Sequence, residues 1–129
     1  MNLHRIAFEA LYKNDALRKG KPQDAHASRN AALNLAHLLR AHGLSATVGY
    51  GFAADESTQN ITAAFVAALH SACSIQGSDA TARAQALKTE TDATYLLHSR
   101  LALLLADGFG LAAKALWPTD DTSQETQHA

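Results

Sequence analysis

Cysteine, proline and aromatic residues are scarce in this sequence of 129 residues. The single cysteine, Cys73, excludes an internal disulfide and fits a reducing compartment. Proline occurs only at Pro22 and Pro118, so no proline interrupts a helix between them. Aromatic residues make up 6% of the chain, whereas alanine supplies much of its 47% hydrophobic content. This composition favours packed helices, because alanine is the best helix former and its small side chain permits close approach.

Long apolar runs are also absent. No run approaches the roughly 20 residues that span a bilayer, and Arg5, Glu9 and Lys13 interrupt the N-terminus where a signal peptide would need an apolar segment. We therefore expect a soluble, cytoplasmic protein. The length fits a single helical domain over residues 1–117. Residues 118–129 are expected to form a disordered polar tail, because they have nothing to bury.

Sequence motifs for metal or nucleotide chemistry are missing as well. The sequence contains no HExxH or CxxC. His37 and His42 are five residues apart, so on a helix they point in different directions, unlike an i, i+4 ligand pair. GYGF and GFG lack the strand-to-helix context of a phosphate-binding loop. We expect a protein that is not an enzyme, with no catalytic residues, no metal site and no cofactor.

The spacing of apolar residues predicts an all-α protein, a compact bundle of about five helices. Asn2 caps the first helix, and Gly43 lies where the second should end. Thr91 or Asp92 caps the last helix, which is apolar nearly all round and should be the most buried. Gly108 and Gly110 suit a close crossing or a kink there. We expect long helices over residues 2–19, 25–42, 55–76 and 92–117, and a loosely held surface helix over 78–91.

The segment over residues 44–54 fits two structures. Val48, Tyr50 and Phe52 alternate as in a strand, whereas Leu44, Val48 and Phe52 are four apart as in a short helix. The rest of the chain offers no convincing second strand for pairing. The helix is therefore the favoured interpretation, and the strand stays open as the alternative.

The helix expected over residues 25–42 has one polar face and one apolar face. A polar face of this kind usually just contacts water. However, residues 1–42 hold seven basic and three acidic residues, a net charge of +4, whereas residues 43–129 have a net charge of −5. This asymmetry hints that the N-terminal part faces a polyanion. The apolar face consists of Ala27, Ala31, Leu35, Leu38 and Leu39, and the polar face of His26, Arg29, His37 and Arg40.

The order of elements resembles a known family, the small all-helical subunit of class 1 CRISPR effector complexes, most closely the type III-B (Cmr) small subunit. Three stretches carry the resemblance: GLSATVGYGF at residues 43–52, TDATYLLHSRLALLL at 91–105, and GLAAKALWP at 110–118. Relatives tend to carry Trp and basic residues where this chain has Gly108, Phe109 and Gly110. The resemblance therefore gives no support for a nucleic-acid contact from the last helix.

The resemblance implies a non-catalytic subunit of an antiviral ribonucleoprotein complex. Such subunits stack into a short filament, contact other effector subunits, and line the guide RNA and target nucleic acid through backbone phosphates. On that basis Arg29 and Arg40 are the expected phosphate contacts, with electrostatic help from Lys13, Lys19 and Lys21. The alternative is a small helical interaction or regulatory protein without nucleic acid, a dimer through an alanine-rich face.

Overall fold

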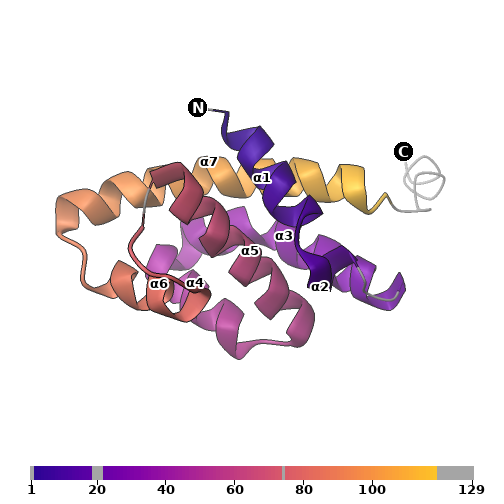
Figure 1. The fold of residues 1–129 in the computed structure, drawn as a ribbon, viewed down its shortest axis with the longest axis horizontal. Coiled ribbons are helices and arrows are strands. Elements are labelled where there is room, and N and C mark those ends of the chain that lie inside the picture. The colour runs from indigo at the N-terminus through magenta and orange to yellow at the C-terminus, as the bar shows by residue number, and fades with distance from the viewer. Residues whose placement is uncertain (1, 19–21, 74, 119–129) are drawn as a thin grey trace.

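The computed structural model describes residues 2–18, 22–73 and 75–118 (Figure 1). Within these ranges the chain forms seven helices and no strand, so the all-α prediction is confirmed. The expected tail lies outside the described residues from position 119 onward. The helices are α1 (Leu3–Tyr12), α2 (Asp15–Arg18), α3 (Pro22–His42), α4 (Leu44–Ala53), α5 (Glu56–Cys73), α6 (Ala80–Lys88) and α7 (Asp92–Leu116).

The core lies where α1, α3, α5 and α7 meet. Figure 1 shows α7 running along the length of the molecule, with α1 crossing it. Both α1 and α3 pack against α7 and against α5. At the centre, the fully buried rings of Phe65 and Phe109 contact edge to face, with centroids 5.5 Å apart. This geometry suits the opposite charges of a ring's edge and face, and it joins α5 to α7.

The first expected helix is divided in two, so the prediction of one helix over 2–19 is wrong. The Asn2 side chain caps α1 as predicted, accepting a hydrogen bond from the Arg5 N–H at 3.1 Å. The helix ends at Tyr12, and Asn14 then accepts from the Leu17 N–H at 3.1 Å. This second cap starts α2, and it competes with continuation of α1 because asparagine binds nearby backbone N–H groups well.

The segment over residues 44–54 is a helix, as favoured from the sequence. Gly43 separates α3 from α4 with a φ of +88°, a conformation that side chains with a Cβ rarely adopt. One hydrogen bond links the first turn of α4 to α7, since the Ser45 N–H donates to the Tyr95 hydroxyl at 2.8 Å. Two of the stretches that carry the family resemblance, 43–52 and 91–105, therefore meet in space.

Helix α7 begins and ends as its sequence predicts. Thr91 is its N-cap, and the helix stops at Leu116, two residues before Pro118. A close crossing accounts for Gly108, since a Cβ there would lie 3.1 Å from the Ala7 Cβ of α1. Only the inner face of α7 is buried, however. Its outer face exposes several leucines, because no other described helix covers that side.

The chain from the end of α5 to the start of α7 contains less helix than expected. Helix α5 ends at Cys73 rather than near Gln76, and Gly77 adopts a φ of +126° in the following loop. Asp79 caps α6 by accepting from the Ala82 N–H at 2.8 Å. Leu87 is the one buried residue of α6, which fits the prediction of a surface helix held by few contacts.

Two glycines of α4 should respond oppositely to alanine. A Cβ on Gly51 would lie 2.0 Å from the Thr62 hydroxyl oxygen, whereas a Cβ on Gly49 would meet nothing within 4 Å. We expect Gly51→Ala to destabilise the fold by about 2 kcal/mol through overpacking, and Gly49→Ala to stabilise it by up to about 1 kcal/mol through helix propensity. Urea denaturation of both variants is the measurement. Equal effects of the two changes would contradict the close α4–α5 contact.

Candidate functional site

The buried face of α3 is rotated from the one predicted. The described buried positions are Ser28, Ala32, Leu35 and Leu39, spaced by three or four residues. Leu35 and Leu39 were expected, but Ala27, Ala31 and Leu38 lie at the edge and are only partly buried. The rotation occurs because α3 packs against both α5 and α7. On the expected polar side, Asp107 and Gly110 of α7 lie near Arg40 and Leu33.

The predicted phosphate contacts do not form one free basic cluster. Arg40 is exposed, and its guanidinium lies 3.7 Å from the Asp107 carboxylate of α7. Lys13 is exposed on α1, with its ammonium 3.9 Å from Glu9, which also pairs with Arg5 at 3.2 Å. Exposed pairs at such distances contribute only about 0–1 kcal/mol. Their charges are therefore partly compensated but still available to a stronger anion.

Arg29 differs from the other predicted contacts. Its side chain is partly buried, and its Nε has no hydrogen-bond partner among the described residues. A buried donor without an acceptor is unfavourable, so an anion that reached it would satisfy an unmet hydrogen bond. His26 and His37 are exposed on the same side of the helix, and His26 lies 3.2 Å from the Asn30 amide. Lys19 and Lys21 lie outside the described residues.

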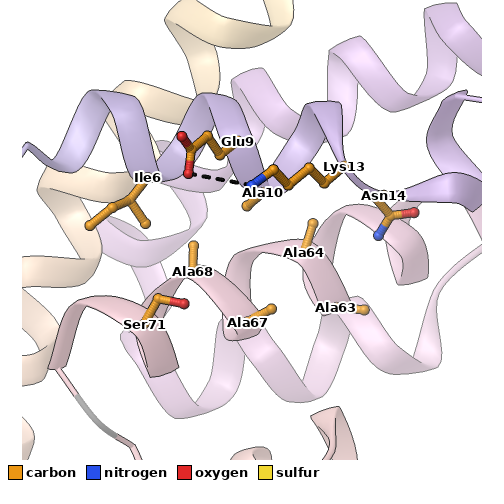
Figure 2. Close-up of a pocket in the computed structure, with 10 residues that line it drawn as sticks. All are labelled: Ile6, Glu9, Ala10, Lys13, Asn14, Ala63, Ala64, Ala67, Ala68 and Ser71. Carbon is orange, nitrogen blue, oxygen red and sulfur yellow. Dashed lines mark ion pairs between the residues drawn. The ribbon is translucent and has the colours of Figure 1, made fainter.

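A shallow groove of about 410 Å³ lies between α1 and α5 (Figure 2). Its α5 side is made mostly of alanines, and the Glu9–Lys13 ion pair lies on its α1 side. The groove lacks a buried polar group, so nothing in it fixes the orientation of a ligand.

One cluster of buried titratable groups joins three elements. His98 of α7 places its Nδ1 against the Glu90 carboxylate in the loop before α7, and both side chains are about nine-tenths buried. The second carboxylate oxygen, Oε1, has no hydrogen-bond partner among the described residues, and the His98 Nδ1 contacts Glu90 without the geometry of a hydrogen bond. Cys73, at the end of α5, lines the same cavity of about 410 Å³. No sequence pattern indicated this cluster, because its members belong to different elements.

The electrostatics of this cluster do not favour a nucleophile. Burial, together with the nearby Glu90 carboxylate, raises the pKa of the Cys73 thiol to about 11. The thiol is therefore protonated at neutral pH, and it donates to the Leu69 carbonyl oxygen at 3.0 Å. Among the described residues, no group of three or more His, Cys, Asp or Glu side chains could hold a metal ion. The cluster is best explained as a structural contact that holds the loop before α7 against α7, beside the end of α5.

The outer face of α7 carries an exposed leucine row that the sequence interpretation missed. The row consists of Leu97, Leu104 and Leu111, seven residues apart and 52–57% exposed, with Leu96 beside it. The seven-residue spacing of these leucines is visible in the sequence. However, α7 is apolar on almost every side, so the spacing alone does not show which leucines face outward. Arg100, Asp107 and Lys114 flank the row, and all three are exposed, as predicted from their own spacing.

Length and composition alone would allow α7 to cross a membrane. Of the 18-residue stretch of α7 with the highest mean hydropathy, 44% is buried inside the bundle. The core helix of a soluble protein can have the same length and hydropathy. The apolar content of α7 is thus explained in part by its inner face, which packs on α1, α3 and α5. The outer leucine row is the part that this packing does not explain.

Comparisons of this chain with protein-family models, with curated proteins and with solved structures found no match. The structure therefore supports a fold class, the all-α bundle, and any more particular assignment is a proposal.

Proposed function

We propose that this protein is a non-catalytic small subunit of a CRISPR ribonucleoprotein effector complex in the cytoplasm. It lines the guide–target nucleic acid through backbone phosphates and packs against neighbouring subunits. The observation that carries the proposal is the contact between residues 43–52 and 91–105, joined by the Ser45–Tyr95 hydrogen bond. This hydrogen bond links two of the three stretches that carry the family resemblance, although α4 itself packs mainly against α5.

The arrangement of charge supports Arg29 as the leading phosphate contact. Its Nε is buried without an acceptor, so a movement of the side chain that brought this atom to a phosphate oxygen would satisfy it. Arg40 would exchange a long, exposed pair with Asp107 for a phosphate. Both residues lie on α3, whose rigid backbone fixes their separation, and such contacts position a subunit without reading base sequence. Lys13 adds electrostatic attraction from outside the main phosphate contact, because its ammonium shares the Glu9 carboxylate with Arg5.

The test is a salt titration of binding to single-stranded RNA. Each phosphate contact on a single strand contributes about −0.7 to the slope of log K against log salt. We expect the Arg29→Glu/Arg40→Glu double variant to bind more weakly and to lose about 1.4 from the magnitude of that slope. The Lys88→Glu/Lys114→Glu variant makes the same change in net charge on other helices, and it should keep the wild-type slope. Equal losses in both variants would refute a specific role for α3.

A second candidate is a helical interaction module that binds proteins and no nucleic acid. The exposed leucine row of α7 favours it, because an apolar face of this kind marks protein contacts. The same titration separates the two candidates. Apolar association barely weakens as salt rises, whereas polyanion binding weakens steeply. RNA binding that is absent at low salt would leave the interaction module as the better proposal.

A further inference from the structure

The outer face of α7 is an exposed seam of apolar and charged side chains. Ala93, Leu97, Arg100, Leu104, Asp107, Leu111 and Lys114 follow one another at alternating steps of four and three residues. These steps keep them on one side of a helix, as in the seam of a coiled coil. All seven are exposed, so the seam has no covering element among the described residues. Three leucines alternate with three charged residues along it.

We propose that two copies of this chain pair through this seam, with their α7 helices antiparallel about a two-fold axis beside Leu104. The axis falls midway between positions 103 and 104. Leu104 then meets the partner's Leu104. With a rise of about 1.5 Å per residue, each Leu97 lies within about 1.5 Å, along the helix axis, of the partner's Leu111. Three apolar layers therefore coincide in one register.

The same register pairs the charges. Arg100 faces the partner's Asp107, and the two-fold axis repeats this pair on the other side. Arg100 has no ion-pair partner among the described residues, whereas Asp107 has only the long contact to Arg40. The Asp107 carboxylate has two oxygens, so it can accept from both arginines. Lys114 faces the partner's Ala93, over which its aliphatic stem can lie.

Other arrangements of the seam are less favourable. A parallel pair would bring Arg100 against Arg100, Asp107 against Asp107 and Lys114 against Lys114, and opposed like charges are costly at an interface. The antiparallel pair replaces two of these repulsions with attractions. It also uses the same patch on both copies, which closes the assembly at two chains. Three leucine layers and two ion pairs form a small interface, so we expect a dissociation constant in the micromolar range.

This dimer goes beyond the proposed function, because it requires no nucleic acid. Analytical ultracentrifugation of the whole chain without RNA, over about 1 µM to 1 mM, is the experiment. We expect a reversible shift from 13.7 kDa to twice that mass. Leu104→Glu should raise the dissociation constant at least about tenfold, whereas Tyr50→Glu, on the exposed ring of α4, should leave it unchanged. Circular dichroism checks that both variants keep their helices.

A pair of charge variants tests the register itself. Arg100→Glu places a carboxylate opposite the partner's Asp107, and Asp107→Lys places a cation opposite the partner's Arg100. Each variant alone should be monomeric at concentrations where the wild type is dimeric. An equimolar mixture should recover a one-to-one dimer, because both contacts then pair opposite charges.

Three results would overturn the proposal. The first is a wild-type chain that stays monomeric to 1 mM. This result counts against the dimer also where the monomer binds phosphatidylcholine vesicles through α7. The second is growth into open polymers, which indicates contact between unlike surfaces. The third is a mixture of charge variants that stays monomeric. None of these results bears on the RNA titration, so the dimer and the nucleic-acid role can fail separately.

Discussion

Replacing Phe109 with alanine should lower the free energy of unfolding by about 4 kcal/mol, because it removes a fully buried ring from the centre of the bundle. The ring contacts Phe65 edge to face, so the change also removes the main aromatic link between α5 and α7. A domain of this size has about 5–15 kcal/mol in total. The change should therefore remove a large fraction of the total stability.

Chemical denaturation followed by circular dichroism measures this effect, with Phe109→Leu as the graded variant. Leucine keeps most of the apolar volume, so we expect a loss well below that of alanine. Tyr50→Ala is the matched control for removing a ring at an exposed position, since Tyr50 is 61% exposed. It should change stability by less than about 0.5 kcal/mol. A Phe109→Ala variant as stable as this control would contradict the central position of the ring.

Features set by local chemistry could be predicted from the sequence. The Asn2 and Thr91 caps each depend on a side chain that binds an N–H three residues away. The end of α3 depends on a glycine that tolerates positive φ. In each case the residues that determine the structure lie within one turn of one another, so the pattern contains all the information needed.

Features set by packing could not be predicted in the same way. The sequence around Lys13 keeps helical spacing, and only the Asn14 cap shows that a new helix starts there. The buried side of α3 depends on where α7 lies, since alanine and leucine occur on most of its circumference. The Arg40–Asp107 pair joins positions 67 residues apart, so the compensation of a predicted phosphate contact was not visible from α3 alone.

The two faces of α7 explain how one helix can both stabilise the domain and bind a partner. Its inner face contributes Phe109, Leu105 and Ala102 to the core. Its outer face exposes the leucine row to water. Burying that row against a partner would contribute about 25 cal/mol of free energy per Å² of apolar surface. A mutation on the inner face should therefore unfold the chain, whereas one on the outer face should change assembly and leave the fold intact.

Replacing His98 with alanine should destabilise the protein by about 3 kcal/mol, because it leaves the Glu90 carboxylate buried without its partner. One oxygen of Glu90 already lacks a hydrogen bond among the described residues, so the loss of His98 would remove the contact that compensates the other oxygen. The cluster holds the loop before α7, and we expect this region to lose protection from hydrogen exchange first.

A double-mutant cycle of His98→Leu, Glu90→Leu and the variant that carries both changes separates the interaction of the pair from the packing of its members. Glu90→Gln should cost less than His98→Ala, since a neutral amide is easier to bury than an unpaired carboxylate. The His98→Leu/Glu90→Leu double variant removes both polar groups and keeps apolar volume, so we expect it to be more stable than His98→Ala despite carrying two changes. Denaturation midpoints of the wild type, the two leucine single variants and the double variant measure the coupling. If the losses of the two single variants simply add, His98 and Glu90 act independently, and the pair does not hold the loop before α7 against that helix.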